Sequence, residues 1–213
     1  MKITKAGYQI ITPIDGETII RRIEEIGRVC YKSEDKITGD SCRKFVKMLI
    51  DRGHEAMIEH CLFTVKFICD RGISHEIVRH RIASYAQEST RYCNYSADKF
   101  GNEITVIAPC FWTETELSYD FWKKSCIEAE KTYFSLIEYG ASPQKARSVL
   151  PNSLKTEIIV TMNLREWRHF FRLRTAKTAH PQMQEITRPL LVEIKTLIPV
   201  VFDDILYETG DTI

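Results

Sequence analysis

Apolar residues of this 213-residue chain recur at intervals of three and four in most segments, a spacing that predicts amphipathic helices. These helices are expected over residues 15–28, 40–52, 72–82, 113–139, 142–150, 163–174 and 181–206. In the third, Ile73, Ile77 and Val78 are expected to point inward. Pro189 and Pro199 are expected to bend or break the last one.

A smaller number of segments is rich in β-branched and aromatic residues, which favour strands. Strands are predicted over residues 2–12, 61–69, 103–108 and 154–162. The polar segment 84–96 is predicted to be a loop over a site. No repeat or linker divides the chain, and helices separate the strands. We therefore expect one α+β domain over residues 1–213, with a mostly antiparallel sheet packed by helices, several of them long.

Composition narrows the class of protein. The hydrophobic content is 44%, which is enough for a core and excludes disorder. No apolar run is long enough to span a membrane, and the N-terminal residues lack a signal peptide, so a cytoplasmic protein is expected. The net charge of +1 argues against binding to polymeric nucleic acid. Seven cysteines without a C-x-x-C motif predict reduced thiols.

The arginines are clustered, although the net charge is near zero. Nine of the fifteen are Arg79, Arg81, Arg91, Arg147, Arg165, Arg168, Arg172, Arg174 and Arg188. The run Arg79-His80-Arg81 is followed by hydroxyl and amide side chains, a set suited to phosphate. A solvated helix end is the simpler interpretation of an isolated R-H-R.

The segment 163–174 carries both an apolar stripe and several charges. At helical spacing Arg174 borders the stripe, so its guanidinium needs an acidic partner or a bound anion. Arg165, Arg168 and Arg172 lie three and four residues apart, where like charges repel, and Glu166 is the only offset nearby in sequence. A bound polyphosphate would turn this repulsion into attraction.

Five ordered motifs resemble those of one enzyme family. They are GRVCYKS (27–33), GHEAMIEHCLFTVKF (53–67), R-H-R-x7-S (79–89), ARSVLP (146–151) and MNLREWRHFFRLR (162–174) with the later His180. Together they span about 150 residues and are similar to the signature of the flavin-dependent thymidylate synthases. The resemblance implies reductive methylation of dUMP to dTMP, with methylenetetrahydrofolate as carbon donor, FAD as hydride carrier and NADPH as reductant. It also implies a homotetramer whose active sites are shared between subunits.

The resemblance assigns roles to individual residues. Arg174 would be the catalytic residue, contacting the uracil and favouring its ionised form. The flavin-binding set would be Ala56, Arg79, His80, Arg81, Gln87, Asn163, Arg165, His169 and His180. The dUMP-binding set would be Glu76, Ile77, Val78, Arg79, Gln87, Glu88, Ser89, Thr90, Arg91, Arg147 and Arg174. Within it, residues 87–91 would come from a neighbouring subunit, with Ser89, Arg91 and Arg147 around the phosphate.

Three positions depart from the family pattern or vary within it. Glu76 stands where other members have Gln, and because a carboxylate repels phosphate it is expected to orient Arg79 or a sugar hydroxyl instead. His169 stands where some members have Asn, so its bond to flavin would depend on pH. Ala56 lacks the hydroxyl found in some members, which weakens that flavin contact.

Other functions are weighed against this one. Classical thymidylate synthases use a Cys nucleophile in a Pro-Cys-His setting, but here Phe111 follows Pro109-Cys110 and no activating base is near in sequence. His54 and His60 stand in H-E-x4-H rather than H-E-x-x-H, so no metal is expected. The remaining alternative is a non-catalytic nucleotide- or RNA-binding module.

Overall fold

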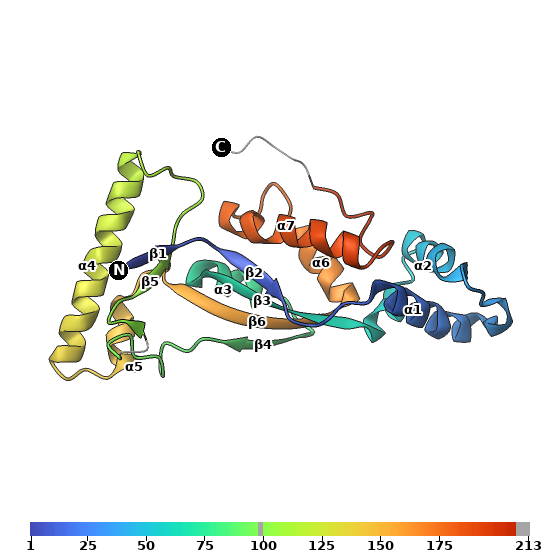
Figure 1. Ribbon diagram of the computed structural model, residues 1–213, viewed down its shortest axis with the longest axis horizontal. Coiled ribbons are helices and arrows are strands. Elements are labelled where there is room, and N and C mark those ends of the chain that lie inside the picture. Colours follow the sequence, from blue (N-terminus) through green and yellow to red (C-terminus); the bar gives the residue numbers. More distant parts are fainter. Residues whose placement is uncertain (98–99, 208–213) are drawn as a thin grey trace.

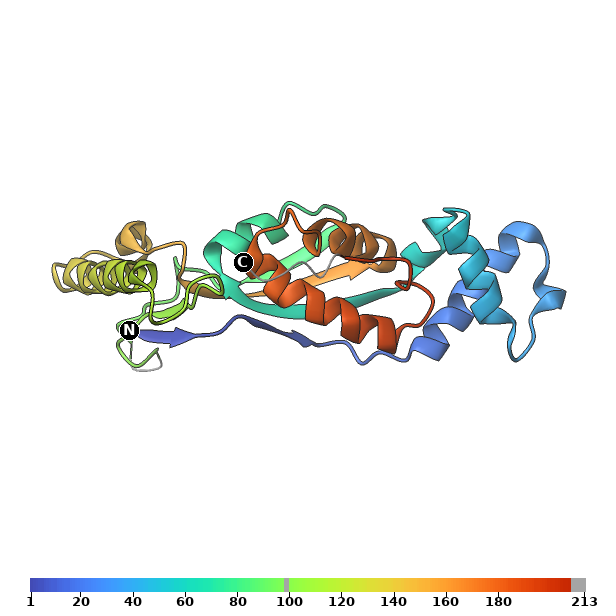
Figure 2. The same ribbon diagram turned by 90° about the horizontal axis from the view of Figure 1, so that it is seen from above.

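The computed structural model describes residues 1–97 and 100–207 and has an α+β architecture, which confirms the predicted fold class. Its shape is elongated, with α4 at one end and α1 and α2 at the other (Figures 1 and 2). The helices are α1 (Gly16–Tyr31), α2 (Ser41–Asp51), α3 (Arg71–Ile77), α4 (Leu117–Glu138), α5 (Pro143–Ala146), α6 (Leu164–Arg174) and α7 (Pro181–Leu197). Short 3-10 turns are η1 (Glu34–Lys36), η2 (Glu55–His60) and η4 (Arg147–Val149).

Most strands form one antiparallel sheet. Its order is β2 (Gly7–Ile10), β3 (Leu62–Asp70), β6 (Lys155–Asn163) and β4 (Ala83–Gln87). The long strands β3 and β6 pair over their whole lengths, with Leu62 opposite Asn163 and Asp70 opposite Lys155. A separate parallel pair joins β1 (Lys2–Thr4) to β5 (Thr105–Ile107). The predicted mostly antiparallel sheet is therefore confirmed.

The main core lies between this sheet and helices α6 and α7 (Figure 1) and continues into the packing of α1, α2 and η2. Alternate residues of β3 and β6 are buried, as period-two patterning requires of a sheet covered on one face. Trp167 of α6 stacks on Phe63 at 4.6 Å between ring centroids, and its indole N–H donates to the Phe63 carbonyl at 3.1 Å. A second core under α4 and α5 contains Tyr95, Ile104, Val106, Cys126, Tyr133, Ala146 and Leu154.

Several predicted boundaries were wrong. The segment 84–96 begins with strand β4, which pairs with β6, whereas its small and polar residues gave no hydrophobic signal for a strand. The helix predicted over 72–82 ends at Ile77, and Val78 is exposed rather than inward. The last helix continues through Pro189 but ends at Leu197, two residues before Pro199. The segment 2–12 forms two short strands instead of one.

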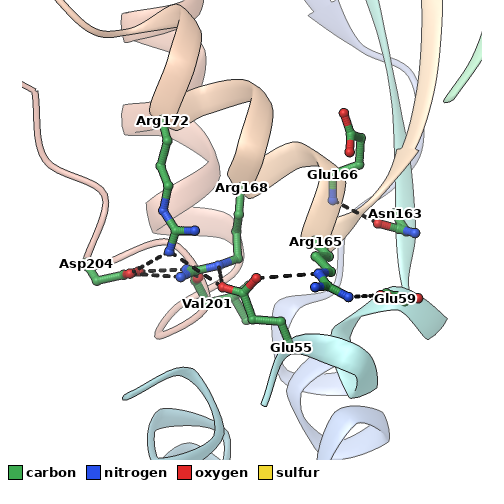
Figure 3. Close-up of polar contacts among 9 residues, drawn as sticks. All are labelled: Glu55, Glu59, Asn163, Arg165, Glu166, Arg168, Arg172, Val201 and Asp204. Carbon is green, nitrogen blue, oxygen red and sulfur yellow. Dashed lines mark hydrogen bonds and ion pairs between the residues drawn. The ribbon is translucent and has the colours of Figure 1, made fainter. Parts of the chain in front are cut away.

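Arg168 of α6 is completely buried and holds the C-terminal segment against the core (Figure 3). Its guanidinium donates to both carboxylate oxygens of Asp204, at 2.6 and 2.8 Å, and to the Val201 carbonyl. Its Nε donates to Glu55 of η2 at 3.1 Å. The acids that offset the arginines of α6 thus come from distant segments, whereas Glu166, the only acid nearby in sequence, faces His80.

We predict that Arg168→Ala lowers the free energy of unfolding by about 3–5 kcal/mol, because it leaves the carbonyl of the buried Val201 and the largely buried Glu55 carboxylate without this donor. Arg172→Ala is the matched control, since the Arg172 side chain is 48% exposed and pairs with the same Asp204 and Glu55. The control should lose less than about 1 kcal/mol. Urea unfolding measures both, and equal losses would contradict the structural role of Arg168.

Candidate active site

Arg174 is the last residue of α6, and its guanidinium is held on three sides. Its Nε donates to Nε2 of His80 at 3.0 Å. One terminal nitrogen donates to the Glu76 carboxylate at 2.6 Å, and the other to the Glu76 carbonyl at 2.8 Å. The side chain is 13% exposed. The prediction that Arg174 borders the apolar stripe and takes an acidic partner is confirmed.

Glu76 has a different partner from the one expected. Its carboxylate pairs with Arg174, whereas the sequence had suggested that it would orient Arg79 or a sugar hydroxyl. The Arg79 side chain is exposed, and within the described residues it has no hydrogen bond or ion pair. A carboxylate at position 76 therefore fixes the arginine proposed for catalysis.

His80 is buried beneath Arg174 and is neutral. Burial, together with the nearby charges of Arg174 and His169, lowers the pKa of His80 to about 4. Nε2 accepts from Arg174, so the single ring proton resides on Nδ1, which faces Oε1 of Glu166 at 3.3 Å. The ring also packs edge-on against Phe170, with centroids 4.9 Å apart.

A ring nitrogen of His80, a ring nitrogen of His169 and a carboxylate oxygen of Glu166 lie within 4.8 Å of one another. Such a group of atoms could in principle bind a metal ion. A metal ion on this cluster would need a free lone pair on His80 Nδ1. That nitrogen carries the proton because Arg174 donates to the other one. The geometry therefore favours a hydrogen-bonded chain over a metal site.

A cavity of about 470 Å³ lies beside this chain of residues, at the N-terminal end of α6. It is lined by Glu55, Glu59, Ile82, Asn163, Arg165, Glu166, His169 and Arg172. Three residues predicted to bind flavin, Asn163, Arg165 and His169, thus share one cavity. Arg165 pairs there with Glu59 at 2.5 Å, so an anionic ligand would exchange with this carboxylate.

The backbone is strained at the rim of this cavity. Ile82 has a φ of 65°, in the left-handed region that β-branched residues avoid, and its side chain is exposed. The strain costs about 1–3 kcal/mol. Ile82 is the one apolar residue among the described residues that line the cavity. The adjacent Arg81 is exposed.

The other predicted flavin residues lie in different surroundings. Ala56 is exposed on η2, next to the cavity-lining Glu55. Gln87 donates to the hydroxyls of Ser74 and Thr156, at 2.8 and 3.3 Å, away from the cavity lining. His180 is the N-cap of α7, where its Nδ1 accepts from the backbone N–H of Gln182 at 3.3 Å. Neither Gln87 nor His180 lines the cavity.

The predicted phosphate residues form a second group after β4. Arg147 donates to the hydroxyl of the buried Thr90 at 3.2 Å, and the Ser89 hydroxyl accepts from the backbone N–H of Arg91 at 3.3 Å. Glu88 accepts from the Tyr95 hydroxyl at 3.2 Å. The five residues of β4 separate this group from the cavity by about 17 Å. One chain therefore does not bring the two groups together.

Cys110 is unsuited to nucleophilic attack. Desolvation and the neighbouring Glu185 raise the pKa of its thiol to about 11, so the sulfur stays protonated at neutral pH. This agrees with the sequence argument that nothing activates Cys110.

Sequence reasoning missed Glu166 as a member of the site. The signal was present, because Asn163 and Glu166 have the three-residue spacing of a helix N-cap. The Asn163 side chain does accept from the Glu166 backbone N–H, at 2.9 Å. The Glu166 side chain, however, turns to His80 across the fold, which no local pattern reveals.

Comparison with known proteins shows which family the chain resembles. A family model described as thymidylate synthase complementing protein matches residues 16–200. A flavin-dependent thymidylate synthase of Pyrococcus abyssi is 37% identical over 164 residues, which cover 76% of this chain and 66% of that protein. Its counterpart in Pyrococcus furiosus is 36% identical, with 85% and 74% covered. That of Geobacter sulfurreducens is 33% identical, with 83% and 78% covered.

The fold is shared with a solved structure. The crystal structure of the UMP/dUMP methylase PolB from Streptomyces cacaoi, bound with 5-Br dUMP, matches with a TM-score of 0.77. The match covers 95% of this chain and 96% of that chain at 19% sequence identity, so it supports the fold alone.

These matches and the site define a flavin-dependent methyltransferase enzyme. The chain belongs to the flavin-dependent thymidylate synthase family, as its motifs had indicated. Within the described residues, no helix combines the length and apolar character needed to cross a bilayer.

We predict that His80 makes stability depend on pH. Its pKa is about 4 when folded but about 6.5 when unfolded, so the unfolded chain binds the extra proton first as the pH falls. The stabilisation is complete above about pH 6.5 and is lost progressively toward pH 4, by about 3 kcal/mol. His80→Asn should remove this part of the slope. Urea unfolding between pH 4 and 7 tests it, and identical slopes in both proteins would contradict the assignment.

Proposed function

We propose that this chain catalyses the reductive methylation of dUMP to dTMP, with methylenetetrahydrofolate as carbon donor and NADPH as the source of reducing equivalents. The observation that carries the proposal is the fixed guanidinium of Arg174, beside a cavity lined by predicted flavin ligands. The names of the relatives, which are thymidylate synthases, support the substrate. We further propose a single catalytic domain acting in the cytoplasm.

Arg174 would act on the uracil ring. Three of its donor groups are already engaged by His80 and Glu76, so the guanidinium plane is oriented before substrate arrives. Negative charge develops on the uracil as its C5 becomes nucleophilic. A preorganised donor aimed at developing charge stabilises it without reorganisation during the reaction.

FAD would occupy the cavity at the start of α6. The donor set fits, because the Asn163 amide, the His169 ring and the Arg165 guanidinium can each donate to flavin carbonyls or phosphate oxygens. Ile82 adds an apolar surface at the rim for a ring system. When bound, the flavin supplies the hydride, while these residues bind and orient it.

The phosphate of dUMP would be held by Ser89, Arg91 and Arg147 of a neighbouring subunit. The length of β4 supports this division, since it separates residues 88–91 from the cavity of the same chain by about 17 Å. A homotetramer with shared active sites would bring Arg174 of one copy to the phosphate group of another.

Tritium release from 5-tritiated dUMP tests the proposed reaction. Release should require FAD, NADPH and methylenetetrahydrofolate together, because C5 loses its hydrogen as a proton only after the one-carbon unit has bonded to it, and turnover needs a hydride to reduce that unit to the methyl group. The purified protein should also be yellow and free FAD on denaturation. A colourless protein that FAD cannot reconstitute, but that still binds dUMP, would favour the non-catalytic nucleotide-binding module.

Arg174→Ala should lower kcat by about 100- to 1000-fold, the usual cost of removing one preorganised donor to developing charge. Flavin binding should survive, since Arg174 does not line the cavity. Arg174→Lys should recover little, because an ammonium lacks the fork that spans His80 and Glu76. Tritium release and the flavin absorbance of the purified variants measure the two effects. Loss of flavin with Arg174→Ala would reassign Arg174 to the cofactor.

A further inference from the structure

Glu166 has no part in the function described so far, although it occupies a central position. It lies in the first turn of α6, between the flavin cavity, which it lines, and the buried ring of His80. Its side chain is only 14% exposed, and that of His80 is 2% exposed. Oε1 of Glu166 lies 3.3 Å from His80 Nδ1, and within the described residues it is the only carboxylate paired with His80.

The proton on His80 can reside on either ring nitrogen, and the two choices have different consequences. With the proton on Nδ1, Nε2 accepts from Arg174 while Nδ1 donates to Glu166, so both contacts are satisfied. With the proton on Nε2, two N–H donors face each other across 3.0 Å, and Nδ1 and the Glu166 carboxylate meet as two acceptors. A carboxylate at position 166 therefore selects the tautomer that can hold Arg174.

We propose that Glu166 is a positioning residue for Arg174, acting through His80. It accepts the Nδ1 proton of His80 and so keeps Nε2 free to accept from the Nε–H of Arg174. The chain Glu166–His80–Arg174 fixes the edge of the guanidinium opposite to the contacts made by Glu76. The catalytic consequence rests on the proposed role of Arg174, whereas the choice of tautomer does not.

Two other contacts limit how the His80 ring can move when Glu166 is lost. The Tyr85 hydroxyl shares its one proton between the His80 carbonyl at 2.5 Å and the Ile77 carbonyl at 3.1 Å, which holds the backbone at this position. Phe170 packs edge-on against the ring, which restricts its rotation. With backbone and ring plane held, loss of Glu166 leaves the buried Nδ1–H of His80 without its acceptor. A shift of the proton to Nε2, which also breaks the bond donated by Arg174, is the change to detect.

The first experiment compares Glu166→Gln, Glu166→Leu and wild type by ¹⁵N NMR of histidine-labelled protein, recorded near neutral pH without substrate or flavin. His80→Gln identifies the His80 signals. Wild type should show a protonated Nδ1 and an unprotonated Nε2. Glu166→Gln should keep this tautomer, because its amide oxygen still accepts. Glu166→Leu should shift the proton toward Nε2. A wild-type proton on Nε2, or an unchanged tautomer in Glu166→Leu, would overturn the proposal.

The second experiment measures tritium release at saturating FAD, so that any weaker flavin binding is separated from catalysis. Glu166→Leu should lower kcat by about 10- to 100-fold, the usual cost of losing a group that orients a functional histidine, while Glu166→Gln recovers most of it. Glu166→Leu should cost much less when His80 is already Gln, since the path runs through His80. Glu128→Leu, on the exposed face of α4, controls for loss of a carboxylate.

The outcomes separate the two proposals. Additive effects of Glu166→Leu and His80→Gln on kcat would overturn a path through His80. If neither Arg174→Ala nor Glu166→Leu changes turnover while the tautomer still follows Glu166, the proposed role of Arg174 fails and so does the catalytic part of this inference. An intact effect of Arg174→Ala with no effect of Glu166→Leu overturns only the role of Glu166.

Discussion

The high cost of burying a guanidinium organises helix α6 and the segments around it. Two of its arginines have little or no contact with solvent, Arg168 at 0% exposure and Arg174 with a side chain at 13%. Each therefore requires acceptors on several sides, and those acceptors come from segments far away in the sequence. Glu55 and Asp204 close around Arg168, while Glu76 and His80 close around Arg174.

The two arginines serve different purposes because they lie six residues apart, about 120° around the helix axis. Arg168 faces η2 and the C-terminal segment, and its network ties these to the core. Arg174 faces the turn after α3, and its network fixes donor groups that the proposed reaction needs. One helix thus contributes both to stability and to the site, which places strict demands on its eleven residues.

The sequence predicted those features that have local or periodic signals. The apolar stripe of α6, the alternation in β3 and β6 and the need of Arg174 for a partner all follow from spacing. The sequence did not predict the features that depend on long-range contacts. Strand β4 forms because it pairs with the edge of β6. Its own residues are small and polar and do not predict a strand. The acids around Arg168 come from residues 55 and 204, which no helical spacing connects.

Only part of the candidate site was predicted, because the rest also depends on long-range contacts. The resemblance of the motifs predicted Asn163, Arg165 and His169 as flavin ligands, and in the fold all three line one cavity. It could not show that Glu76 pairs with Arg174 rather than Arg79, because that depends on how the end of α3 meets the end of α6. The sequence also did not predict the left-handed backbone at Ile82, because isoleucine disfavours this conformation.

Strand β6 sets the distance between the cavity at the start of α6 and the residues that follow β4. Its last residue, Asn163, lines the cavity proposed for flavin, and its partner β4 leads in fixed register to residues 88–91, which are proposed to hold phosphate. A one-residue deletion inside β6 would turn the buried residues on one side of the deletion toward the opposite face and shift their pairs with β3 and β4 by one residue. The length of β6 therefore fixes how far the cavity at the start of α6 lies from residues 88–91 of the same chain.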